Sequence, residues 1–140
     1  MKERVIDASG LILGRLASYV AKRALLGDTV AIVNVEKAII TGSRRRVFDR
    51  YKMFRAKGTP TQGPFTPRRA RDIFKRTLKR MLPYKRPRGR DALERVKAYK
   101  GLPVRYANMV LETLPVAHVS KVPTTKYVTL QDVTHFLGGE

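Results

Sequence analysis

The chain has 140 residues, no cysteine and a formal net charge of +19 at pH 7, because 30 Lys and Arg residues face only 11 Asp and Glu residues. This length suits one domain spanning residues 1–140, and the hydrophobic share of 43% argues against wholesale disorder. The lack of cysteine excludes disulfides, thiolate zinc sites and cysteine nucleophiles. The positive charge points to a polyanionic partner, with nucleic acid as the best candidate.

The N-terminal part of the chain, up to Thr41, predicts a βαβ unit. Residues 5–7 form a short apolar strand, and apolar residues recur at helical spacing from Leu13 to Leu25, with Gly27 as the C-terminal cap. Residues 29–35 are nearly all apolar, which is typical of a buried strand in a parallel sheet. Residues 38–41 predict a third short strand.

Two basic helices are predicted next. The first follows Ser43, a good N-cap residue, and carries an apolar stripe that includes Val47 and Tyr51. After a loop over residues 58–66, the second helix begins at Thr66 and Pro67, as N-cap and first helical position, and Pro83 ends it.

The remaining elements are shorter. Residues 83–90 predict a basic loop stiffened by two prolines, and a short helix carrying Ala92, Leu93 and Val96 follows, closed by Gly101. Residues 108–114 and 116–119 are candidate strands. Thr129 and Asp132 form a capping-box pattern that opens a final helix ending near Leu137.

The positive charge is concentrated in the middle of the chain. Residues 41–100 hold 21 Lys and Arg residues against 4 Asp and Glu residues, whereas the rest of the chain holds 9 against 7. A solvated helical surface would be expected to carry compensating acids four residues away, and few are present. The middle third therefore predicts a nucleic-acid contact surface mounted on a nearly neutral body.

The candidate RNA-binding residues all lie in this middle third. Those of the loop are favoured most, because the prolines limit the entropy lost on docking and Tyr84 could stack on a base or ribose. The turn at residues 41–44 is either an anion site at a helix N-terminus or a simple capping turn. The candidates are Arg44, Arg45, Arg46, Arg50, Arg55, Lys57, Arg68, Arg69, Lys75, Arg76, Lys79, Arg80, Lys85, Arg86, Arg88 and Arg90.

Catalysis is disfavoured. His118 and His135 are the only histidines, and neither belongs to a recognisable catalytic or metal-binding pattern. The acids are too few and scattered for a metal site. We therefore expect no catalytic residue, no metal, no cofactor and no small-molecule substrate. A membrane partner is also not expected, because no apolar run reaches the roughly 18 residues of a spanning helix.

The order and spacing of several segments resemble the ribosomal protein L13 family of the large ribosomal subunit. Two segments are similar to the start of that family, namely Val5-Ile6-Asp7-Ala8 and Gly14-Arg15-Leu16-Ala17-Ser18. Two more are similar to its next two strands, namely Val33-Asn34-Val35-Glu36-Lys37 and Thr41-Gly42. The most diagnostic stretch combines Met81-Leu82-Pro83, Gly89-Arg90 and Lys97-Ala98-Tyr99-Lys100-Gly101. The tail, including Lys126-Tyr127-Val128-Thr129-Leu130, resembles the archaeal and eukaryotic branch.

The resemblance implies a three-layer α/β/α core around a four-stranded, mostly parallel sheet, with basic helices and loops built onto it. It also implies binding to large-subunit ribosomal RNA, a role in subunit assembly, neighbouring large-subunit ribosomal proteins as partners, and a location in the ribosome in the cytoplasm.

Two other functions stay open at this point. One is a nucleic-acid-binding module outside the ribosome, which would not remain with the large subunit through a moderate-salt wash. The other is an α/β enzyme that holds a nucleotide on its glycine turns, which a free nucleotide would stabilise against heat.

Overall fold

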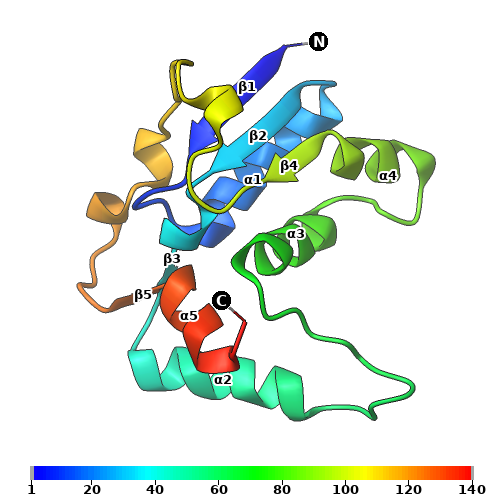
Figure 1. Ribbon diagram of the computed structural model, residues 1–140, viewed down its shortest axis with the longest axis vertical. Helices are drawn as coiled ribbons and strands as arrows, with labels where there is room; N and C mark the ends of the chain where they lie inside the picture. Colours follow the sequence, from blue (N-terminus) through cyan, green and yellow to red (C-terminus); the bar gives the residue numbers. More distant parts are fainter. Residues whose placement is uncertain (1, 140) are drawn as a thin grey trace.

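The predicted βαβ unit is confirmed in the computed structural model, which describes residues 2–139. Strand β1 (Glu3–Asp7), helix α1 (Leu13–Leu25) and strand β2 (Thr29–Val33) follow one another at the top of the molecule (Figure 1). The two strands pair in parallel, with Ile6 opposite Ile32. The predicted apolar stripe of α1 is buried from Leu13 to Ala24.

Strand β4 (Val96–Ala98) lies where the sequence predicted a helix, and that prediction is wrong. It pairs in parallel with β2, so that the sheet order is β1-β2-β4. Backbone bonds from Val30 N to Arg95 O (3.1 Å) and from Tyr99 N to Ile32 O (2.8 Å) hold it there. Val96 and Ala98 are buried and Lys97 is exposed. Three residues are too few for this alternation to be told from helical spacing.

The expected fourth strand of the main sheet is absent among residues 2–139, where this sheet has three strands. Strand β3 (Ile39–Thr41) instead pairs antiparallel with β5 (Tyr127–Thr129), which the sequence analysis missed. The cause lies just after β2. Asn34 adopts a left-handed backbone (φ 55°) and the 3-10 turn η1 (Val35–Lys37) follows, which redirects the chain away from the sheet.

The two candidate strands over residues 108–119 are also wrong. Only single bridges form there, Ile6 with Glu112 and Leu11 with His118. The 3-10 turn η3 (Pro115–Ala117) lies in this stretch, η4 (Val119–Lys121) begins at its end, and η2 (Val104–Tyr106) precedes it. Pro115, which lies between the two candidate strands and lacks a backbone N–H, stands at the start of η3 and cannot donate to a strand ladder.

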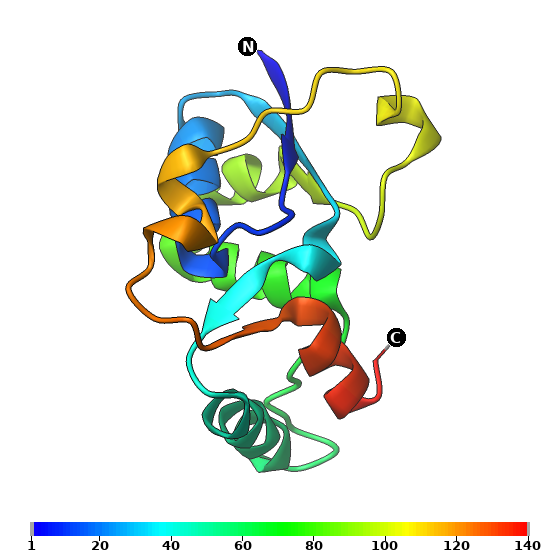
Figure 2. The same cartoon turned by 90° about the vertical axis from the view of Figure 1, so that its left-hand side faces the viewer.

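The main sheet separates two clusters of buried side chains. Ile6, Ile32 and Val96 pack with the helices α1, α3 and α4, whereas Val5 and Val33 pack with Tyr106 on the opposite face. In Figure 2, α1 and α4 lie on one side of the strands and the yellow segment with η2 lies on the other. Within residues 2–139, a 3-10 turn and extended chain thus occupy the face where a second helical layer was expected.

Helix α2 (Arg44–Ala56) starts as predicted, because the Ser43 hydroxyl accepts a hydrogen bond from the Arg46 N–H at 3.3 Å. Helix α5 (Leu130–Leu137) is capped by Thr129 in the same way, which confirms that prediction too. Phe48 of α2 stacks on Phe136 of α5 with ring centroids 4.5 Å apart. Chain segments more than 80 residues apart in sequence therefore pack as one unit at the bottom of Figure 1.

The starts of the two other helices differ from the predictions. Helix α3 (Ala70–Met81) begins after Arg69, because Thr66 is buried and its hydroxyl donates to the Phe54 carbonyl at 3.1 Å instead of capping a helix. Helix α4 (Pro87–Glu94) begins inside the predicted loop, with Pro87 in its first turn. A proline at that position loses no hydrogen bond and its φ suits a helix.

Candidate nucleic-acid interface

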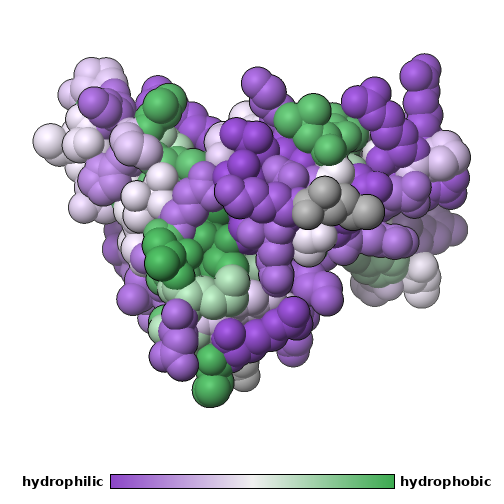
Figure 3. Space-filling model, turned by 90° about the horizontal axis from the view of Figure 1, so that it is seen from above, coloured by the Kyte–Doolittle hydropathy of each residue, from purple (hydrophilic) through white to green (hydrophobic). Residues whose placement is uncertain are grey.

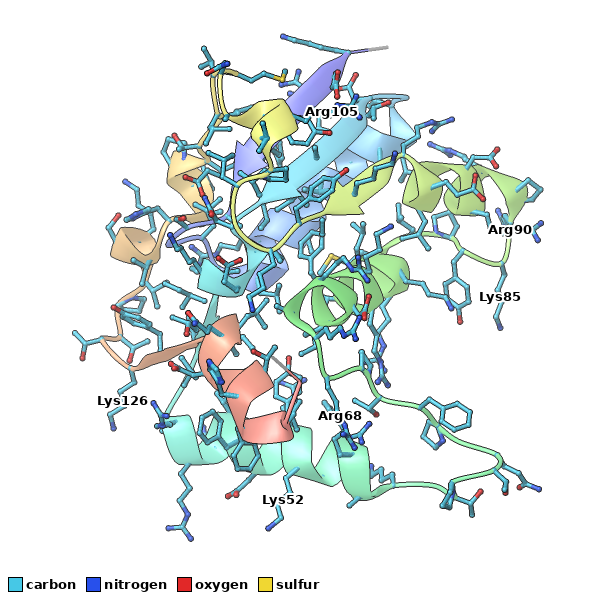
Figure 4. The ribbon with its side chains drawn as sticks, viewed as in Figure 1. Lys52, Arg68, Lys85, Arg90, Arg105 and Lys126 are labelled. Carbon is cyan, nitrogen blue, oxygen red and sulfur yellow. The ribbon has the colours of Figure 1, made fainter. Side chains whose placement is uncertain are left out.

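The predicted RNA-binding residues lie on α2, on the segment 57–69, on α3 and on the turn 83–86 with α4. Figure 4 shows Lys52 at the lower edge, Arg68 between α2 and α3, and Lys85 and Arg90 at the right-hand edge. Arg105 and Lys126, which belong to the nearly neutral ends of the chain, lie at the top and at the lower left. The middle third of the chain therefore presents its charge along two adjoining edges of the molecule.

Most of the sixteen candidates are free to meet a partner. Thirteen are exposed, whereas Arg55, Lys75 and Arg76 are half-buried. Few of the exposed ones are neutralised by an acid. Arg44 lies 3.9 Å from Asp132, and Arg45 lies 4.0 Å from Asp49 on the same helix. Such exposed pairs contribute little to stability, so a phosphate could replace the acid at small cost.

Arg55 has a different position from the one the sequence suggested. Its guanidinium turns inward and donates to the Thr66 carbonyl at 2.7 Å. Together with the bond from the Thr66 hydroxyl to Phe54, this contact ties the segment 57–69 to the end of α2. The structure therefore gives Arg55 a role in positioning that basic segment.

The turn 83–86 and α4 are closely packed. Gly89 is buried, and a Cβ added to it would collide with the carbonyl of Pro83. The Lys79 ammonium lies 4.8 Å from the centre of the Tyr84 ring, and the Arg86 N–H donates to the Pro83 carbonyl at 2.9 Å. The turn is thus held by α3 and α4, while Lys85, Arg86, Arg88 and Arg90 stay exposed.

A second group of basic residues joins α3 to β4. Arg71, Asp72 and Lys75 line a shallow hollow with Lys97 and Tyr99. Burial lowers the pKa of Lys75, and repulsion from Arg71 and Lys97 lowers it further, against the attraction of Asp72. Arg71 and Lys97 were not among the candidates. The sequence predicted a helix where Lys97 lies on strand β4, so the side of the molecule on which its side chain is exposed was not predicted.

The chemistry of these surfaces is that of anion binding. No cluster of three or more potential metal ligands occurs among the residues that the structure describes. The ring of His118 lies with Nδ1 3.0 Å from the Ser120 hydroxyl, and both residues are exposed. Within the described part of the chain, no helix is long and apolar enough to cross a lipid bilayer.

Comparison with known proteins identifies relatives along nearly the whole chain. The profile of a family described as Ribosomal protein L13 matches residues 1–105. The large ribosomal subunit protein uL13 of Methanococcoides burtonii is 48% identical over 97% of this chain and 98% of its own length. The uL13 proteins of Archaeoglobus fulgidus and Methanosarcina barkeri are 48% and 46% identical, over 96% and 97% of this chain and 86% and 98% of their own lengths.

Proposed function

From the premise that the chain belongs to the ribosomal protein L13 family, we propose that it is a structural constituent of the large ribosomal subunit that binds and stabilises large-subunit ribosomal RNA and supports subunit assembly. It does so as a single domain, and its role is structural and not enzymatic. Its relatives in three archaea are named as proteins of that subunit.

The observation that carries this proposal is the segregation of charge. A net charge of +17 over residues 41–100 lies on the exposed faces of helices and turns that pack against the βαβ unit, whereas the rest of the chain has a net charge of only +2. Lys and Arg side chains on such a surface displace the counterions of RNA and bridge phosphate strands that repel each other. Arginine also gives bidentate contacts to phosphate, which fix orientation.

The proposal includes neighbouring large-subunit ribosomal proteins as partners and the cytoplasmic ribosome as the location. The exposed apolar side chains of Val104, Met109 and Val110 support a protein neighbour, because they belong to the segment that covers the second face of the sheet. Viewed from above, this end of the molecule carries apolar areas separated by hydrophilic side chains (Figure 3).

A charge-matched pair of triple variants tests the RNA surface. We expect replacement of Lys85, Arg86 and Arg88 by Ala to weaken binding to large-subunit ribosomal RNA by at least about tenfold at moderate salt, because three exposed cations of one turn are lost. Filter binding or fluorescence anisotropy at fixed ionic strength measures the change.

The control replaces Lys22, Lys37 and Lys121, three exposed lysines outside residues 41–100, by Ala. It removes the same charge and is expected to weaken binding much less. Equal losses for the two variants would show that net charge alone, and not the middle third, attracts the RNA.

Sedimentation separates the ribosomal role from a nucleic-acid-binding role elsewhere. The protein should stay with the large subunit through a moderate-salt wash of cell extract. Recovery only among free proteins would contradict the proposal.

A further inference from the structure

A cleft with a volume of about 510 Å³ opens between α2 and α3, at the first turn of α1 and alongside β3. We call it the α2–α3 cleft. Its volume falls in the range of about 300–1,000 Å³ that is usual for pockets that bind small organic groups. In Figure 1 the two helices come from the green and cyan parts of the chain, with α2 below α3.

Four arginines line the α2–α3 cleft. Arg46 and Arg50 are four residues apart on α2, and Arg76 and Arg80 are four residues apart on α3. Because that spacing places side chains on one helix face, each helix presents a pair of guanidinium groups. No acid among residues 2–139 forms a salt bridge with any of the four.

The floor of the α2–α3 cleft is apolar. The buried side chains of Leu13, Ile39 and Val47 lie among the lining residues, together with the half-buried rings of Tyr51 and Phe54. The two rings meet edge to face with centroids 6.0 Å apart, and the Arg50 guanidinium lies 5.6 Å from the Phe54 ring centre. The cleft thus combines aromatic and aliphatic walls with a cationic rim.

The Arg76 guanidinium has one donor without a partner within residues 2–139. Its Nη1 atom is buried and has no hydrogen-bond acceptor among the described residues. Burial also raises the pKa of the neighbouring Tyr51 hydroxyl, against the attraction of Arg50 and Arg76. A buried donor of a charged group without an acceptor destabilises the protein, and a phosphate oxygen that reached it would remove this cost.

We propose that the α2–α3 cleft receives one unpaired nucleotide of the ribosomal RNA, whose phosphate contacts the arginines and whose base or ribose packs on the apolar floor. This inference rests on the proposed RNA-binding function and names a specific subsite for it. A continuous duplex backbone presents phosphates but keeps its bases stacked inside, so it does not match the apolar floor. Single-stranded nucleotides, in contrast, are recognised by stacking and phosphate contacts together.

The sharpest test fills the α2–α3 cleft without changing its charge. Gly14 lines the cleft, its φ is not positive, and a Cβ added to it meets no atom within 4 Å. We expect Gly14→Leu to lower the affinity for large-subunit ribosomal RNA by about tenfold, which corresponds to the loss of one stacked base. Its affinity for a fully duplex RNA of matched length should stay unchanged, which also reports that the variant is folded.

Charge variants give an independent measurement. Arg76→Gln should lower the affinity for ribosomal RNA as Gly14→Leu does, because it removes the cation that lacks a partner. The matched control is Arg45→Gln, on the exposed face of α2 and outside the cleft, where the guanidinium already pairs with Asp49. Arg45→Gln should change the affinity for ribosomal RNA by no more than a factor of about two.

The outcomes separate this inference from the proposed function. If the unaltered protein does not bind ribosomal RNA, both fail. If the unaltered protein binds ribosomal RNA and both Gly14→Leu and Arg76→Gln bind it with the same affinity as the unaltered protein, only the cleft assignment fails. If adenosine monophosphate stabilises the unaltered protein against heat, Gly14→Leu abolishes this effect, and neither variant changes the affinity for ribosomal RNA, the cleft is a site for a free nucleotide, and the inference is overturned.

Discussion

At the residue scale, Arg4 connects three distant parts of the chain. Its guanidinium contacts Asp28 at 3.0 Å and Glu112 at 3.1 Å, and the Tyr19 hydroxyl donates to Glu112 at 2.9 Å. These bonds join β1, the turn before β2 and the segment that bridges to Ile6. The hydrogen bond from Arg4 lowers the pKa of Asp28 below its ordinary value.

This lowered pKa predicts how stability depends on pH. A carboxyl group whose pKa is lower in the folded state stabilises the fold above its unfolded value of about 3.9, and this stabilisation is lost as the pH falls through the folded pKa. We expect Asp28→Asn to unfold at lower urea concentration than the unaltered protein at pH 7, with the difference shrinking as the pH drops below about 4. A difference that is constant from pH 7 to pH 3 would contradict the ion-pair explanation.

At the element scale, α4 owes its position to a glycine. Gly89 lies in the first turns of this helix, and its missing side chain lets the Pro83 carbonyl approach. The close approach brings the turn 83–86 against α4 and so places Lys85 and Arg86 beside Arg88 and Arg90. Neither the turn nor the helix alone would require glycine there.

The same substitution at two helical glycines is expected to have opposite effects on stability. Gly89→Ala should destabilise the protein by about 1–3 kcal/mol, because its methyl group collides with backbone that must shift. Gly14→Ala, in α1 with open space around the added atom, should be neutral or stabilise by up to about 1 kcal/mol through helix propensity. Urea unfolding monitored by circular dichroism compares them, and equal effects would exclude the close approach at Gly89.

Helix α3 separates a packing face from a binding face. Leu78 is fully buried in the main core and Lys79 beside it is exposed. We expect Leu78→Ala to cost about 2–5 kcal/mol of stability. Lys79→Ala should change stability by no more than about 1 kcal/mol, the most that its exposed contact with the Tyr84 ring contributes, but weaken RNA binding. Thermal unfolding and RNA affinity measured on both variants test this division, and a loss of RNA affinity only in the unstable variant would contradict it.

At the scale of the whole molecule, the charge sets both the attraction to RNA and the repulsion within the protein. Residues 41–100 carry 21 basic side chains on three helices, on β4 and on the neighbouring segments, and only 4 acids offset them. The helical core, held together by Leu16, Ile32 and Phe74, keeps these charges at fixed positions despite their repulsion. A polyanion would relieve that repulsion while it binds.

Affinity for ribosomal RNA should therefore fall steeply with salt. If 6–10 phosphates are contacted, we expect a loss of about 10³–10⁵ in affinity between 50 and 200 mM salt. Replacing Lys85, Arg86 and Arg88 by Ala should reduce the slope of log affinity against log salt by about 2–3. The variant neutralises fewer phosphates, so fewer counterions are released when it binds. A salt titration of both proteins measures the slopes, and a flat response would exclude phosphate contact as the main source of affinity.

The sequence by itself determined the elements whose signals are local. Apolar spacing defined α1, the caps Ser43 and Thr129 located the starts of α2 and α5, and the apolar run of β2 indicated a buried parallel strand. The concentration of charge in the middle third and the family resemblance were also evident from the sequence alone, because composition and residue order need no knowledge of contacts.

Only the tertiary structure decided what depends on partners distant in sequence. Val96–Ala98 is a strand because the edge of β2 offers it backbone hydrogen bonds, and Thr66 is buried by contacts with Phe54 and Arg55 and therefore does not cap a helix. Likewise, two arginine pairs on separate helices line one cleft only because the fold places α2 and α3 on opposite sides of it. Such contacts depend on how segments that are distant in sequence pack against each other, and the residues of either segment alone do not specify this packing.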